Sequence, residues 1–139
     1  MEPAPEIDAF PICTTDKLRY RDTDRQGHVN SAVFSTFFET GRVEILYAPS
    51  MTLSIPDGEF VIARLALEYR TEVRWPGMVR VGTKIASVGK SSIKLEQAVF
   101  QDETCAATVE TVIVLIDSHN RQAKPLPDET LLILSSYKR

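Results

Sequence analysis

Residues 30–46 read NSAVFSTFFETGRVEIL, and this stretch decides the fold. Its apolar side chains recur at the three- and four-residue spacing of a helix with one broad buried face: Val33, Phe34, Phe37, Phe38, Ile45 and Leu46. Asn30 is a favourable N-cap and Pro49 a stop, so we expect one long helix between them. Gly41 lies on the apolar face, where a missing side chain lets a sheet approach the helix backbone closely. The stretch therefore predicts a long helix packed on a sheet.

Strand patterns follow the helix. The segment 61–73 alternates strictly, and its expected buried face is formed by Val61, Ala63, Leu65, Leu67, Tyr69 and Val73. Pro76 and Gly77 then break the chain, and three further strand-like runs follow at about 79–88, 92–101 and 105–117. The turns between these runs are too short for the crossover that a parallel pair needs. The pattern predicts an antiparallel meander.

A weaker strand signal over 14–22 precedes the helix, with Leu18 and Tyr20 two positions apart. The order of one strand, one long helix and four strands is typical of an α+β domain with the helix packed across one concave antiparallel sheet. A chain of 139 residues has the usual size of one domain. We expect a single domain over 13–139, preceded by a loose arm, 1–12, that contacts it through Phe10 and Ile12.

Composition excludes several classes of function. A formal net charge of −3 gives no electrostatic reason to bind nucleic acid. Cys13 and Cys105 lie far apart without CxxC spacing, which argues against a zinc site or a disulfide framework and fits a reducing cytosol. No apolar run approaches the length of a bilayer crossing, and the acidic, proline-bearing N-terminus has no signal-peptide pattern. We expect a cytoplasmic protein with no nucleic-acid or membrane partner.

The densest group of functional side chains is DTDRQGHVN, residues 22–30, in the loop that enters the helix. Loops of this kind commonly carry functional sites. The N-terminus of a helix offers unpaired N–H groups and the positive end of the helix dipole, so it can polarise a carbonyl oxygen without a charged side chain. A carboxylate beside that oxygen can then perform chemistry, and the loop is therefore the candidate site.

Each side chain of the loop also has a structural interpretation. Asp24 can form an Asx-turn or lie near the positive end of the helix without any chemistry. Asp22 is expected to orient the loop by accepting backbone N–H groups, and His28 either shuttles protons or, as we favour, holds the loop by hydrogen bonds. Nothing else in the sequence completes a metal-ligand set with these three residues, so no metal is expected. A haloacid-dehalogenase-like interpretation of residues 22–24 fails because no alternating strand and helix units follow.

The loop 22–30, together with Phe34 and the Glu39…Arg42 pair, resembles the 4-hydroxybenzoyl-CoA thioesterase family of hotdog-fold proteins. The resemblance implies a hotdog fold, in which a curved antiparallel sheet of about five strands wraps a long central helix. It also implies an acyl-CoA thioesterase without a metal or bound cofactor, since CoA is part of the substrate. The sequence departs from the commonest family pattern at Ser31, where a second Asn is frequent, and at Phe34, where Tyr is common. These departures leave the acyl group open.

The resemblance also implies roles for the residues of the loop. Asp24 takes the position of the catalytic carboxylate, as nucleophile on the thioester or as base for water. Gly27 allows a tight approach, and His28 belongs to the same motif. The backbone N–H groups near Asn30 and Ser31 polarise the thioester carbonyl.

Substrate and partner expectations complete this interpretation. Lys90, Ser91 and Ser92 are expected near the nucleotide end of CoA, whose phosphates favour a lysine and hydroxyl donors. Glu39 and Arg42 form a surface ion pair or contribute to a site across an interface. Because members of the family assemble, a homodimer or homotetramer is implied. A non-catalytic module that binds acyl thioesters or small ligands is the alternative function.

Overall fold

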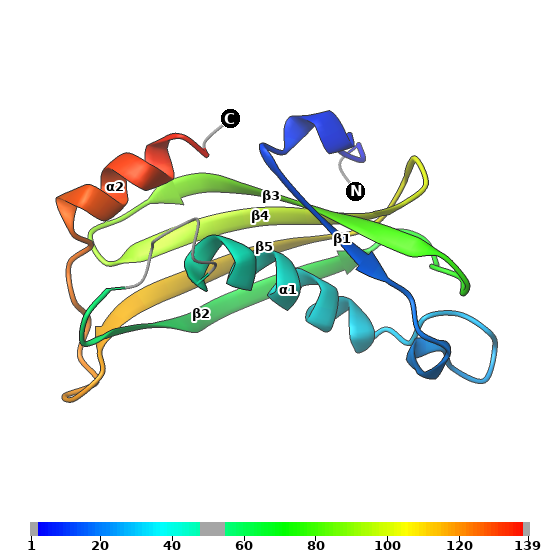
Figure 1. The fold of residues 1–139 in the computed structure, drawn as a ribbon, viewed down its shortest axis with the longest axis horizontal. Coiled ribbons are helices and arrows are strands. Elements are labelled where there is room, and N and C mark those ends of the chain that lie inside the picture. Colours follow the sequence, from blue (N-terminus) through cyan, green and yellow to red (C-terminus); the bar gives the residue numbers. More distant parts are fainter. Residues whose placement is uncertain (1–2, 48–54, 138–139) are drawn as a thin grey trace.

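The computed structural model describes residues 3–47 and 55–137. Five antiparallel strands form one sheet, and helix α1 lies across one of its faces (Figure 1). In chain order the elements are η1 (Ile7–Ala9), β1 (Ile12–Lys17), η2 (Tyr20–Asp22), α1 (Val33–Tyr47), β2 (Gly58–Tyr69), β3 (Met78–Val88), β4 (Ser92–Gln101), β5 (Thr104–Asp117) and α2 (Asp128–Ser135), where η marks a 3-10 helix. The predicted α+β architecture, a long helix wrapped by a curved five-stranded antiparallel sheet, is confirmed.

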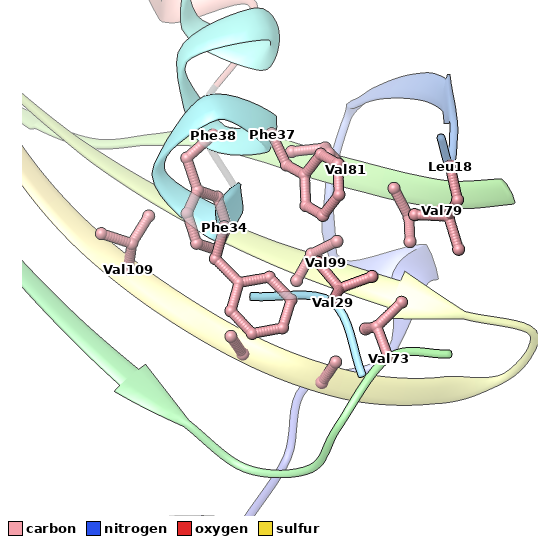
Figure 2. Packing of buried hydrophobic residues seen from close by; sticks show 12 residues of the cluster. Leu18, Val29, Phe34, Phe37, Phe38, Val73, Val79, Val81, Val99 and Val109 are labelled. Atoms are coloured by element: carbon pink, nitrogen blue, oxygen red, sulfur yellow. The ribbon is translucent and has the colours of Figure 1, made fainter. Parts of the chain in front are cut away.

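The core lies between α1 and the sheet. Phe34, Phe37 and Phe38 of α1 are buried and belong to one cluster with valines of the strands. Figure 2 shows the aromatic side chains of α1 among the valines of this cluster. Removing such side chains from water is the main favourable term for holding a helix on a sheet.

Gly41 is the point of closest approach between α1 and the sheet. A Cβ atom at this position would lie 2.7 Å from Nε2 of Gln97 and 3.0 Å from Oγ1 of Thr83. Nε2 of Gln97 donates to the carbonyl of Phe38 and to Oγ1 of Thr83, both at 3.0 Å. The close packing predicted for Gly41 is confirmed.

The sheet order is β1-β3-β4-β5-β2. The predicted meander is right for β3, β4 and β5, which follow one another through short turns. The neighbour of β2 was not predicted: this strand pairs with β5 at the far edge of the sheet. After β2, residues 70–77 connect to β3 on the other side of the sheet. The amides of Arg70 and Thr71 donate to the carbonyl of Ala106 in β5, and Val73 is buried in the core, so this connection is held against the sheet. The alternation fixes the face of each side chain, but it does not fix the neighbouring strand.

The alternation in β2 is interrupted by a bulge. The pairing with β5 shifts between Ile62 and Arg64, which leaves Ala63 as the extra residue. Phe60 packs against the core, and Ile62 pairs with the buried Ile113, so both side chains point to the face of the sheet that carries α1, although Ile62 stays exposed at the sheet edge. Val61 alternates with them and points to the opposite face, and Ala63 is the extra residue of the bulge. The predicted inward orientation of Val61 and Ala63 is therefore wrong, because a bulge reverses the alternation on one side of it.

The first strand is shorter than predicted. β1 ends at Lys17, and η2 occupies 20–22. Leu18 is 2% exposed and Tyr20 is 73% exposed, so the two residues do not share a face. The predicted strand over 14–22 is wrong in its second half.

The start of α1 also differs from the prediction. The helix begins at Val33, three residues after Asn30. The side-chain oxygen of Asn30 accepts the N–H of Ala32 at 3.0 Å, and its carbonyl accepts the N–H of Val33 at 2.9 Å, so Asn30 makes the hydrogen bonds of an N-cap for the turn that leads into the helix. Pro49, the predicted stop, lies outside the described residues.

The N-terminal arm packs on the face of the sheet opposite α1. Phe10 is buried, and its ring centroid lies 6.1 Å from that of Phe100. A Cβ atom at Gly82 would lie 2.6 Å from the Phe10 ring. The expected contact through Phe10 is therefore present. Ile12, which the sequence placed in the arm, is the first residue of β1.

Helix α2 was not predicted. It follows Pro127 and carries Asp128 and Glu129 in its first turn, a recognisable pattern for a helix start, and it buries Leu134. Neither α2 nor any other helix within the described ranges is long and apolar enough to cross a membrane.

We predict that Gly41→Ala destabilises the fold despite the higher helix propensity of alanine, a gain of about 1 kcal/mol. The new methyl group would displace the buried Gln97 amide and its two hydrogen bonds, so we expect a net loss of about 1–3 kcal/mol in the free energy of unfolding. Urea denaturation measures this loss. Ser35→Ala, at an exposed position of the same helix, is the control and should be neutral or stabilising. An unchanged or increased stability of Gly41→Ala would contradict the close approach.

Candidate active site

The loop between η2 and α1 is closed by its own backbone. The N–H of Asp24 donates to the carbonyl of His28 at 2.7 Å, and the N–H of Gly27 donates to the carbonyl of Asp24 at 3.1 Å. Gly27 has a φ of +83°, a conformation that residues with a Cβ rarely adopt. Gly27 therefore makes the tight turn that the loop needs.

The Asp24 carboxylate uses one of its oxygens inside the loop. Oδ1 accepts the N–H of Gln26 at 2.9 Å and that of His28 at 3.2 Å. The side chain is half-buried. Within the described residues, Oδ2 has no hydrogen-bond donor. One oxygen thus fixes the orientation of the carboxylate, and the other is available for a ligand.

Asp22 ties the two ends of the loop together. Its buried carboxylate accepts the N–H of Arg19 at 3.0 Å and pairs with the Arg19 guanidinium at 3.2 Å. Its carbonyl accepts the N–H of Asn30 at 2.8 Å. The Asp22 carboxylate thus accepts a backbone N–H as predicted, although from Arg19 before the loop, and its orienting role stays a prediction.

A second segment, residues 71–74, supports the loop from outside. The N–H of Val29 donates to the carbonyl of Val73 at 2.7 Å. Nε2 of His28 lies 2.9 Å from a Glu72 oxygen, and the other Glu72 oxygen lies 2.8 Å from Nη2 of Arg74. Glu72 was not predicted as part of the site, because an isolated Glu at the end of a strand pattern gives no signal of a contact with a loop more than forty residues away.

These residues surround one hollow of about 450 Å³. Its lining includes Asp24, His28, Ser31, Phe34, Tyr69 and Glu72. Carboxylates and the residues that lead into α1 thus meet beside two aromatic rings. Such a hollow suits a ligand that carries a carbonyl group next to an apolar group.

The matched relatives of this chain are thioesterases. Residues 18–134 match the thioesterase-like superfamily. The chain is 27% identical over 127 residues to a protein of Escherichia coli named acyl-CoA thioester hydrolase YbgC, and the match covers 88% of this chain and 92% of the relative.

Solved structures agree with this match. A thioesterase from Thermus thermophilus, complexed with coenzyme A and Zn, is 27% identical with a TM-score of 0.80 and coverage of 94% of this chain and 97% of the other. The PA5185 protein of Pseudomonas aeruginosa has the same fold, with a TM-score of 0.86, 21% identity and coverage of 98% and 97%. The chain belongs to the thioesterase-like superfamily. The predicted hotdog fold and the predicted enzyme class, thioester hydrolase, are confirmed.

Within one chain of this thioesterase, the predicted nucleotide-binding turn is far from the hollow. Lys90, Ser91 and Ser92 lie between β3 and β4 at the end of the sheet opposite the Asp24 loop (Figure 1). The 11 residues of β3 separate the two ends by about 35 Å at the usual rise per residue. The structure therefore brings the loop residues together but not the 90–92 turn.

Glu39 and Arg42 were expected to form a surface ion pair or to contribute to a site across an interface. The surface ion pair is wrong, because Arg42 is buried. Arg42 is only 7% exposed, and its Nη1 has no hydrogen-bond partner in the described part of the chain. Burial lowers the pKa of the Arg42 guanidinium, and the nearby Glu39 charge acts in the opposite direction. Glu39 itself is exposed. Neither residue lines the hollow.

The acidic side chains and His28 of the site raise the question of a metal ion. Among residues 3–47 and 55–137, no group of three or more His, Cys, Asp or Glu side chains is arranged to hold a metal ion. The zinc named with the Thermus thermophilus structure is a property of that protein.

We predict that Asp22→Ala destabilises the protein by about 1–3 kcal/mol, because it removes the acceptor of two N–H groups of Arg19 at a buried position. Chemical denaturation monitored by tryptophan fluorescence measures the change. Asp16→Ala in β1 is the matched control, with an expected change within about 0.5 kcal/mol. Equal stabilities of the two variants would show that the Asp22 contacts do not hold the loop.

Proposed function

We propose that this protein hydrolyses an acyl-CoA thioester to a carboxylic acid and free CoA at the Asp24 loop. The observation that carries the proposal is the hollow in which the Asp24 carboxylate, with one oxygen available, lies beside Ser31 at the entrance of α1. Relatives named as acyl-CoA thioester hydrolases support CoA as the thiol part of the substrate.

In the proposed reaction, an oxygen atom is delivered to the thioester carbon and the carbon–sulfur bond breaks. Asp24 acts either as the nucleophile or as the base that takes a proton from water. The backbone N–H of Ser31, at the entrance of α1, stabilises the negative charge that develops on the carbonyl oxygen, whereas the N–H of Asn30, also expected in this role, already donates to the Asp22 carbonyl. In the base route, the proton that Asp24 takes from water passes to the CoA sulfur as the carbon–sulfur bond breaks. In the nucleophile route, CoA leaves as the thiolate when the aspartyl anhydride forms, and water then cleaves the anhydride to the free acid and the Asp24 carboxylate, releasing the proton that the thiolate takes up.

In this proposal His28 keeps the loop in place through its contact with Glu72. No resident metal or cofactor is proposed, since CoA is part of the substrate. The cytoplasmic location expected from the sequence stays a prediction.

We predict that Asp24→Asn lowers kcat for thiol release by about a hundredfold or more, because the amide is neither an effective base nor a nucleophile. The amide oxygen can still accept the N–H groups of Gln26 and His28, so the loop should keep its shape. The measurement is free-thiol release from a panel of short, long and aromatic acyl-CoAs.

Asp16→Asn is the control, because Asp16 lies in β1 outside the hollow. Full activity of Asp24→Asn would refute the assignment of the carboxylate. Tight CoA binding by the wild type without thiol release from any acyl-CoA would favour the non-catalytic binding module. A single turnover in ¹⁸O-labelled water that releases unlabelled acid would show that Asp24 is the nucleophile, since attack of water on the aspartyl carbon of an anhydride transfers an unlabelled Asp24 oxygen to the acid.

We also propose that the protein is a homodimer formed along β2. This 12-residue strand is an edge of the sheet, and edges of this length readily pair with another strand. Ile62, Leu65 and Tyr69 of β2, with Val43 and Tyr47 of α1, are large apolar side chains that are exposed in the single chain. A second copy that covers them would remove a continuous apolar surface from water.

We predict that Leu65→Lys converts the proposed dimer to a monomer, because the charge would be buried at the edge where two copies meet. Light scattering coupled to size-exclusion chromatography measures the mass. Leu132→Lys makes the same chemical change at a position of α2 that is 74% exposed, and it should leave the mass unchanged. A dimer in both variants would place the interface elsewhere.

A further inference from the structure

The backbone donors at the entrance of α1 are almost all occupied. The N–H of Asn30 donates to Asp22, the N–H groups of Ala32 and Val33 donate to Asn30, and the N–H of Phe34 donates to the carbonyl of Ser31. Within the described residues, the Ser31 N–H donates no hydrogen bond. Because Ser31 also lines the hollow, its amide is the donor left for a ligand.

Ser31 is held by a residue from another part of the chain. The hydroxyl of Tyr69 donates to the Ser31 carbonyl at 2.9 Å. The Tyr69 ring lies beside the Phe34 ring, with centroids 5.3 Å apart and planes tilted by 40°. Tyr69 is the last residue of β2 and pairs with Ala107 of β5, so the sheet fixes its backbone.

We infer that Tyr69 is a positioning residue, which holds the Ser31 carbonyl so that the Ser31 N–H is directed at the thioester oxygen. This inference rests on the proposed function. The only other donor to this carbonyl among the described residues is the N–H of Phe34 at 3.3 Å, a long hydrogen bond. Ser31 is exposed and precedes the first residue of α1, so the helix alone does not fix it.

The expected effect follows from geometry. One donor aimed at a developing oxyanion is worth about 10²–10³ in rate, and displacement by a fraction of an ångström forfeits part of that. The Tyr69 hydroxyl does not have to touch the substrate for this effect. Its loss should change the rate of the chemical step more than the affinity for the substrate.

The first test is Tyr69→Phe, which removes the hydroxyl and keeps the ring against Phe34. We expect kcat to fall about tenfold, with KM within about twofold of wild type and an unchanged unfolding midpoint. Tyr20→Phe is the matched control, because its exposed ring packs on Trp75 outside the hollow, and it should keep the wild-type kcat. A wild-type kcat for Tyr69→Phe, or a raised KM with unchanged kcat, would overturn the inference.

The second test separates positioning from general packing. An acyl-CoA analogue with CF₂ in place of sulfur is a ketone that takes up water to form a tetrahedral adduct resembling the transition state, whereas an alkyl-CoA thioether lacks the oxygen. Tyr69→Phe should weaken binding of the difluoroketone several-fold and leave binding of the thioether unchanged, as measured by calorimetry. Equal effects on both ligands would overturn the inference.

The outcomes also distinguish this inference from the proposed function. Activity in the wild type, its loss in Asp24→Asn and a normal kcat in Tyr69→Phe would reject only the role of Tyr69. Absence of thiol release by the wild type would reject the proposed function, and the two binding measurements would still decide whether Tyr69 directs the Ser31 amide at a carbonyl.

Discussion

The separation between α1 and the sheet is fixed at Gly41, and the position of the site depends on it. The buried Gln97 amide reaches from β4 to the carbonyl of Phe38, so a side chain of the sheet bonds directly to the helix backbone. No Cβ fits between them at Gly41. Because the helix cannot move away from β3 and β4 without breaking this buried contact, its position on the sheet is fixed. The Ser31 amide and the end of β2 therefore meet in the same hollow.

Two independent sets of bonds then shape the loop at the helix entrance. In the first set, the Asp22 carbonyl accepts the N–H of Asn30 across the loop, and the Asp22 carboxylate accepts the N–H of Arg19 just before it. The 71–74 segment supports it from outside, through Val73 on Val29 and Glu72 on His28. A carboxylate that takes part in catalysis must be held at a defined angle, and Oδ1 of Asp24 is held by two backbone amides of this loop. The Asx-turn and the catalytic interpretation of Asp24 are compatible, because they use different oxygens.

The sequence predicted the features that depend on local pattern. The helix, the three consecutive strands and the role of Gly41 follow from periodicity and from the one glycine on an apolar face. The place of β2 beside β5 was not predicted, because strand order depends on where the 70–77 connection runs, and alternation carries no information on this. The bulge at Ala63 and the contacts of Glu72 and Tyr69 with the loop were missed for a related reason. All three depend on which residues of distant segments lie opposite one another, and that alignment is set only when the sheet has formed.

The proposed pairing along β2 also bears on the distant 90–92 turn. The amide of Leu115 donates to the carbonyl of Ser91, and Leu115 pairs with Phe60, so this turn lies near the first residues of β2. Tyr69 and the hollow lie at the other end of the same strand. A two-fold antiparallel pairing of β2 with its copy sets the first residues of one strand beside the last residues of the other. Under that symmetry, the 90–92 turn of one copy, which lies far from the hollow of the same chain, approaches the hollow of the other copy. One substrate can then contact Asp24 of one copy and the lysine and serines of the other, which gives the dimer a direct role in forming the site.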